Sequence, residues 1–93
     1  MKGKGEFLYT LRALRSEMLT VGPDGKEESS LRRHADYLKR LTAEGVVLLF
    51  GRTQNQDESA FGLVLLQADS EVAAREIMKQ DPAIVDGLME GEL

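Results

Sequence analysis

The stretch Ser30–Gly51, SLRRHADYLKRLTAEGVVLLFG, has the pattern of an inward-facing helix, a helix stop and a buried strand. Gly45 is placed to end the helix, because glycine readily adopts the left-handed conformation found at helix C-termini. The run Val46–Phe50 then follows, apolar on both faces of a strand. Residues at the three- and four-residue spacing of one helical face are Leu31, His34, Ala35, Leu38 and Leu41. This stretch therefore predicts a helix packed on a sheet, with the chain's only histidine facing inward.

The residues before this stretch predict a strand and a loop. Glu6–Leu14 alternates between two faces, as expected of a strand with one buried side. Gly22-Pro23-Asp24-Gly25 is a strong turn signal, so we expect Arg15–Ser29 to be a loop. We expect the helix to begin at Ser29 or Ser30, whose hydroxyl groups can cap free backbone N–H groups.

The residues after it predict a strand pair and a second helix. Phe61–Leu66 is apolar on both faces and is separated from the preceding strand by the polar segment Gly51–Ala60, so the two strands should pair antiparallel. Asp69 or Ser70 is expected to cap a second helix, which should stop at Asp81-Pro82 because the residue before proline avoids the helical region.

The chain after the second helix predicts a short turn and a short strand. Pro82 is a favourable first residue for another helical turn, with Asp81 as its cap and Gly87 as its end. Leu88–Leu93 can form only a short last strand. The order of elements, β-α-β-β-α-turn-β, predicts an α+β, ferredoxin-like split βαβ fold with an antiparallel sheet and two main helices on one face.

The other face of such a sheet would expose apolar residues from both two-sided strands. A large apolar patch on a monomer usually marks an interaction surface. We therefore expect a homodimer in which a second copy packs sheet to sheet.

Composition narrows the classes of function. The chain has 93 residues, which predicts a single domain over 1–93, and 42% of them are hydrophobic. A net charge of −4 argues against a nucleic-acid partner, and the absence of cysteine with a single histidine argues against a metal site. No apolar run is long enough for a membrane span and no signal-peptide pattern is present, so a cytoplasmic protein without a membrane partner is expected. The glycine pairs Gly3-Lys4-Gly5 and Gly22-x-x-Gly25 are too short for a phosphate loop, and no cofactor is expected.

His34 and Asp81 are the residues for which a chemical role can be argued. An inward histidine is often a core or interface residue with one hydrogen-bond partner, but its unperturbed pKa also suits a general base. Asp81 is explained by its capping of the turn at Pro82, or alternatively by orienting His34 from the neighbouring helix. Asp86 is interpreted as a solvated turn residue.

Three further side chains are candidates for contact with a small-molecule ligand. Arg52 follows a buried strand, and its guanidinium could hold a carboxylate through paired hydrogen bonds, although a surface position or a contact with a neighbouring acid is the simpler interpretation. Tyr9 and Tyr37 could present a phenol to a cleft, although core packing with a solvated hydroxyl is the favoured interpretation of an isolated tyrosine.

The sequence resembles the YCII-related (YciI-like) family from about Phe7 to Leu93. The GRT, FG and DP elements recur in place and in order. The segments that carry the resemblance are MLTVGPDGKEE (Met18–Glu28), HADYLKRLTAEGVVLLFGRT (His34–Thr53), DESAFGLVLLQADSEVAAREIM (Asp57–Met78) and DPAIVDGLMEGEL (Asp81–Leu93). Related sequences usually continue past the position of Leu93 with a fuller last strand.

The resemblance implies a dimeric α+β barrel and an acid–base dyad formed by His34 and Asp81. It also implies similarity to dehydrochlorinases, to muconolactone isomerase and to small cofactor-free monooxygenases, without defining a substrate. Two hypotheses follow. The first is a cofactor-independent lyase or isomerase that uses this dyad, and the second is a non-catalytic dimeric module that binds a small ligand or has a regulatory role.

Overall fold

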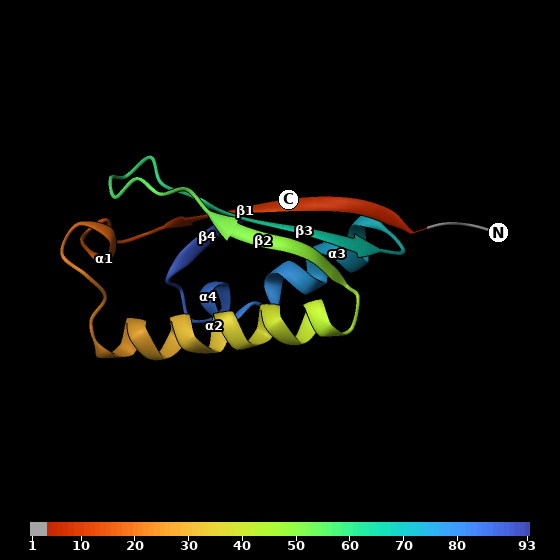
Figure 1. The fold of residues 1–93 in the computed structure, drawn as a ribbon, viewed down its shortest axis with the longest axis horizontal. Helices are drawn as coiled ribbons and strands as arrows, with labels where there is room; N and C mark the ends of the chain where they lie inside the picture. The colour runs from red at the N-terminus through yellow and green to blue at the C-terminus, as the bar shows by residue number, and fades with distance from the viewer. Residues whose placement is uncertain (1–3) are drawn as a thin grey trace.

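The structure, a computed structural model, describes residues 4–93 and contains one four-stranded antiparallel sheet. The strands are β1 (Gly5–Ala13), β2 (Val47–Arg52), β3 (Gly62–Ala68) and β4 (Met89–Glu92). Their spatial order is β2-β3-β1-β4 (Figure 1). This order and the antiparallel pairing confirm the predicted ferredoxin-like α+β fold, including the short last strand.

Four helices connect the strands: α1 (Glu17–Thr20), α2 (Gly25–Ala43), α3 (Glu71–Lys79) and α4 (Pro82–Val85). Figure 1 shows α2, α3 and α4 on one side of the sheet, and α1 at the end of the sheet where β1 leads into α2. Within residues 4–93, no helix combines the length and the apolar character that a membrane crossing requires.

The prediction for Arg15–Ser29 was wrong. This segment is not a loop, because α1 occupies part of it and α2 begins at Gly25, before Ser29 and Ser30. The reason is a capping box: the Asp24 carboxylate accepts from the Glu27 backbone N–H, and the Glu27 carboxylate accepts from the Asp24 N–H.

The remaining helix boundaries follow the signals in the sequence. Gly45 has a positive φ of 78° and follows the last turn of α2. Ser70 caps α3, and Asp81 caps α4 directly before Pro82. Gly87, with a φ of 73°, follows α4 and turns the chain into β4.

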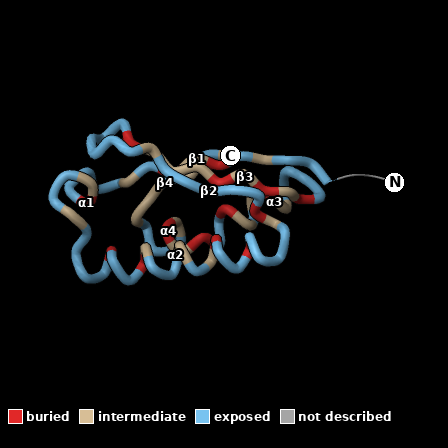
Figure 2. Tube along the Cα trace, in the orientation of Figure 1, coloured by how far each residue is buried: buried red, intermediate tan, exposed pale blue. Residues whose placement is uncertain are grey.

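The core lies between the sheet and the helices, where Figure 2 shows the buried positions gathered. Alternation along β1 directs Tyr9 and Leu11 into this core. Leu38 and Leu41 of α2, Val64 and Leu66 of β3, and Ala74 and Met78 of α3 pack with them.

The opposite face of the sheet carries a row of leucines. Leu8 pairs with Leu65, and Leu65 pairs with Leu49, so these three side chains share one face across three strands. Leu8 is 48% exposed and Leu49 is 51% exposed. This surface, which we call the open face, is apolar at its centre.

One ion pair fixes the corner between β1, α1 and α2. Arg15 makes two hydrogen bonds to the Glu27 carboxylate, at 2.8 Å and 2.5 Å. These bonds, together with the Asp24 backbone N–H, lower the Glu27 pKa from 4.5 to about 2. The bonds tie the chain just after β1 to the first turn of α2, and so close the segment that contains α1.

The Glu27 pKa predicts how acid affects stability. Because the folded-state pKa lies below the unfolded value, the contribution of Glu27 is complete above about pH 4.5 and is lost as pH falls toward 2. Arg15→Gln should therefore lose less stability than wild type between pH 5.5 and pH 3, as measured by urea unfolding. Arg75→Gln, which removes the exposed α3 ion pair with Glu71, should keep the wild-type pH dependence. A wild-type pH dependence in Arg15→Gln would contradict this assignment.

Candidate functional site

His34 and Asp81, which are 47 residues apart in sequence, are joined by a hydrogen bond. The distance from His34 Nδ1 to Asp81 Oδ1 is 2.6 Å. The His34 side chain is 17% exposed, whereas the Asp81 side chain is 0% exposed. His34 comes from the inward stripe of α2, and Asp81 comes from the junction of α3 and α4. The contact therefore joins the two helical units that cover the sheet.

Asp81 accepts hydrogen bonds from three different parts of the chain. Its Oδ1 also accepts from the Ala83 backbone N–H at 3.0 Å, and its Oδ2 accepts from the Tyr9 hydroxyl at 2.8 Å. Asp81 thus caps α4 and also orients His34. Because an ionised carboxylate is an acceptor only, Nδ1 of His34 must carry the proton in this bond. In the neutral form of the ring, the free lone pair then lies on Nε2.

Tyr9 lies behind Asp81 and does not reach a cleft. It is 0% exposed, and burial together with the Asp81 charge raises its pKa above the usual value. The expectation that Tyr9 contacts a ligand does not fit this position. Its hydroxyl instead supports the carboxylate that orients His34.

Tyr37 is also outside the site. Its hydroxyl donates to the Ile77 carbonyl at 2.7 Å and so joins α2 to α3. Burial raises the pKa of Tyr37, and the charge of Asp81 adds to this effect. The Arg40 guanidinium lies 5.3 Å from the ring centroid. These contacts fit a structural role for Tyr37.

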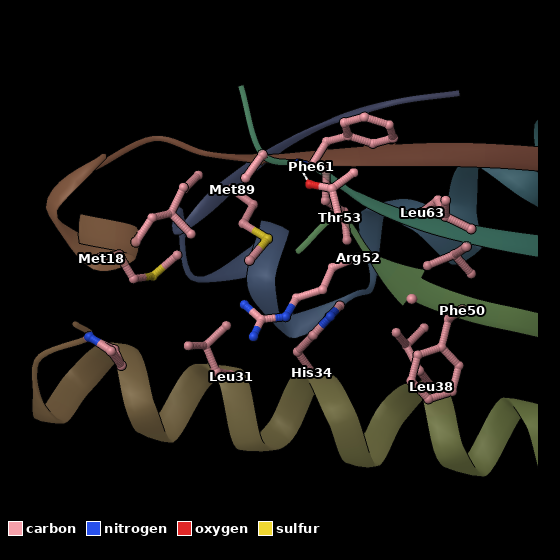
Figure 3. Close-up of a pocket in the computed structure, with 18 residues that line it drawn as sticks. Met18, Leu31, His34, Leu38, Phe50, Arg52, Thr53, Phe61, Leu63 and Met89 are labelled. Atoms are coloured by element: carbon pink, nitrogen blue, oxygen red, sulfur yellow. Dashed lines mark hydrogen bonds between the residues drawn. The ribbon is translucent and has the colours of Figure 1, made fainter. Parts of the chain in front are cut away.

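A pocket of about 470 Å³ lies between the sheet and α2, with His34 in its wall (Figure 3). This volume is within the usual range for small-molecule sites. Nearly all of the wall is apolar, and the polar side chains in it are those of His34, Arg52 and Thr53. Its main apolar side chains are Met18, Leu19, Leu31, Leu38, Phe50, Phe61 and Met89.

Arg52 reaches the pocket because of an irregularity in β2. Val47 pairs with Leu66, but Leu49 rather than Leu48 pairs with Leu65, so the register shifts by one residue. After this shift Arg52 pairs with Gly62 on the helical side of the sheet. Figure 3 shows the Arg52 side chain extending from β2 toward α2, where His34 is located.

The segment around α1 closes one end of the pocket. Met18, Leu19 and Pro23 contribute to the wall there, and Met18 is buried. Sequence reasoning missed these residues because the segment was expected to be a loop. The capping pattern Asp24-x-x-Glu27 was the signal that could have located the start of α2 and hence the short connection before it.

A second polar contact joins α4 to α2 outside the pocket. Asp86 accepts from the Ser30 hydroxyl at 2.5 Å and from Arg33 at 2.6 Å. These two donors lower the Asp86 pKa below its usual value. Asp86 is an exposed residue in the turn after α4, as expected, and its carboxylate additionally joins this turn to α2.

The titratable side chains do not form a recognisable metal site. Within residues 4–93, no group of three or more His, Cys, Asp or Glu side chains is arranged to hold a metal ion. The polar chemistry of the pocket is therefore that of one imidazole, one guanidinium and one hydroxyl.

The family model for the YCII-related domain matches residues 10–91. The chain belongs to the YCII-related family. This match confirms the resemblance drawn from the sequence, and it covers both His34 and Asp81. A comparison with curated proteins found no match.

A solved structure with a similar fold is the 5-chloro-2-hydroxyhydroquinone dehydrochlorinase from Burkholderia phenoliruptrix, in complex with 2,5-dihydroxybenzoquinone. The TM-score is 0.60 and the sequence identity is 21%, and the similarity covers 94% of this chain and 92% of that chain. At this identity, the likeness supports the fold of the YCII-related protein and does not define its substrate.

The contact between Tyr9 and Asp81 predicts a difference between two tyrosine variants. Tyr9→Phe removes a hydrogen bond to a buried carboxylate and should lower the free energy of unfolding by roughly 1.5–3 kcal/mol. Tyr37→Phe removes a hydrogen bond to a neutral carbonyl and should cost only roughly 0.5–1.5 kcal/mol. Urea unfolding of both variants measures the difference, and an equal or smaller loss in Tyr9→Phe would contradict the assigned role of Tyr9.

Proposed function

We propose that this YCII-related protein is a cofactor-independent enzyme of lyase or isomerase type that acts on a small molecule. The observation that carries the proposal is the 2.6 Å hydrogen bond from His34 to a fully buried Asp81, at the wall of a pocket. A histidine oriented by a buried carboxylate, with its second nitrogen free, has the arrangement required of a general base.

The proposed reaction begins with a proton transfer to His34 Nε2. The electron pair of the broken bond to hydrogen remains on the substrate. In a lyase this pair forms a new double bond while a leaving group departs with its own bonding pair. In an isomerase, the proton returns from His34 to a different atom of the substrate. Asp81 keeps its negative charge and stabilises the imidazolium that forms.

Arg52 is the candidate for binding the substrate. Its guanidinium is the charged side chain in the pocket wall that could hold an anionic group or stabilise negative charge that develops during proton transfer. Binding of the substrate between Arg52 and His34 would bring the acidic proton to the base.

A metabolite screen tests whether there is a reaction. Thermal shift on wild type and His34→Gln should identify ligands, and each ligand should then be followed for conversion by mass spectrometry. His34→Gln should lower kcat by about 100-fold or more, because it removes the general base. Asp86→Asn is the matched control, because Asp86 also joins α4 to α2 but lies outside the pocket wall. Asp86→Asn should retain turnover.

Two outcomes would contradict the enzyme. One is a kcat in His34→Gln equal to that of wild type. The other is a ligand that binds wild type but is never converted, with binding alone weakened in His34→Gln. The second result would instead support the non-catalytic binding or regulatory module, since the same pocket would then hold a ligand without chemistry.

We also propose that the protein is a homodimer formed through the open face. The supporting observation is the row of Leu8, Leu65 and Leu49, which a monomer would leave against water. The helices cover only the other side of the sheet (Figure 1). A second copy presents the same surface, so a two-fold arrangement buries both rows at once.

Light scattering at micromolar concentration tests the dimer. Wild type should have the mass of two chains, whereas Leu49→Asp should have the mass of one chain, because a charge at the centre of a dry interface is strongly unfavourable. Val72→Asp is the control, since Val72 is an exposed apolar residue of α3, on the helical side of the sheet. This variant should remain dimeric. A wild-type mass of one chain would overturn the proposal.

A further inference from the structure

We infer that the pocket selects small organic acids that carry one negative charge on an otherwise uncharged, apolar body. This inference rests on the proposed function, because it concerns the same pocket, and it specifies the class of substrate. The argument begins with the charges available to a ligand.

Arg52 is the positively charged side chain in the pocket wall, and it is available. Within residues 4–93, Arg52 has no ion-pair or hydrogen-bond partner. By contrast, Arg15 and Arg33 each pair with a carboxylate. In a chain of net charge −4, an arginine without an acidic partner that faces a pocket is a site for an external anion.

Negative charge on the protein does not compete for Arg52 inside the pocket. Among the residues that the structure describes, no Asp or Glu side chain lines the wall. The carboxylate next to it, that of Asp81, is fully buried and accepts from His34, Tyr9 and Ala83. The pocket therefore offers a cationic ligand no free carboxylate.

The rest of the wall limits how much charge a ligand can carry. Phosphate groups are usually held by several donors at once, such as a helix N-terminus or a cluster of cations. Here one guanidinium faces walls made of Leu, Met and Phe side chains, and Thr53, whose oxygen accepts from the Phe61 N–H at 3.1 Å, adds only a single neutral hydroxyl donor. A second negative charge placed against these apolar side chains would lose water without gaining a partner, at a desolvation cost.

The same geometry sets which atom loses the proton. Arg52 comes from β2 and His34 from α2, and Figure 3 shows the Arg52 side chain extending toward His34. A ligand whose anionic group is bound by Arg52 presents the adjoining part of its body to His34. The acidic proton is therefore expected close to the anionic group.

Binding of simple probes tests this class without any knowledge of the reaction. Isothermal titration should show benzoate binding at least about tenfold more tightly than benzamide, because only benzoate can form the charged pair with Arg52. Terephthalate, which adds a second charge at the far end of the ring, and benzylamine should both bind at least about tenfold more weakly than benzoate.

Two arginine variants provide the matched comparison. Arg52→Met should weaken benzoate binding by about tenfold or more, and it should abolish the preference over benzamide. Arg32→Met removes the same charge from an exposed position of α2 outside the pocket wall, and it should leave benzoate binding within about twofold of wild type.

Equal affinities for benzoate and benzamide, or unchanged benzoate binding in Arg52→Met, would overturn the inference. Undetectable binding of all four probes at millimolar concentration would overturn it too. These results are separate from those on the reaction. Arg52-dependent binding of benzoate stands even if no ligand is ever converted, and a conversion that depends on His34 but prefers neutral or cationic substrates would retain the enzyme and reject this class.

Discussion

The buried carboxylate of Asp81 is the constraint on which the helical side of this fold depends. A charge removed from water must be matched by donors, or it costs several kcal/mol. The donors are the Tyr9 hydroxyl, His34 Nδ1–H and the Ala83 backbone N–H, and they come from β1, α2 and α4. These three hydrogen bonds to Asp81 fix the face of β1 that turns inward, the rotation of α2 about its axis and the point at which α3 ends. One side chain thereby positions three elements.

The same contacts prepare His34 chemically. A structural requirement, the pairing of a buried anion, determines which ring nitrogen carries the proton, and so leaves Nε2 as an acceptor. Structural and catalytic interpretations of this pair are therefore not alternatives, since both follow from one hydrogen bond. What gives the pair its functional interest is that the pocket opens on the His34 side and not on the Tyr9 side.

Part of this site could be predicted from the sequence because it depends on local rules. Helical periodicity identified His34 as inward-facing, and the Asp81-Pro82 dipeptide located both the end of one helix and the cap of the next. The role of Tyr9 could not be read in this way, because alternation in a strand gives the face of a residue and not the group that lies opposite. The predicted start of α2 was wrong for another reason. Pro23-Asp24-Gly25 fits both a turn and a helix cap, and the cap forms because the Glu27 side chain accepts a hydrogen bond from the Asp24 N–H.

The face of the sheet on which Arg52 lies could not be predicted from local sequence patterns. A one-residue change of register transfers every later side chain of a strand to the other face. If Leu48 paired with Leu65, strict alternation would turn Leu49 toward the helices and Arg52 toward the open face. The observed shift between Val47 and Leu49 does the reverse. It turns Arg52 toward the pocket, and it places Leu49 rather than Leu48 opposite Leu65 on the open face. Because Val46–Phe50 is apolar on both faces, the sequence alone does not choose between these registers. The open face is apolar in either register, but only the observed irregularity in β2 turns Arg52 toward the pocket and so determines its charge.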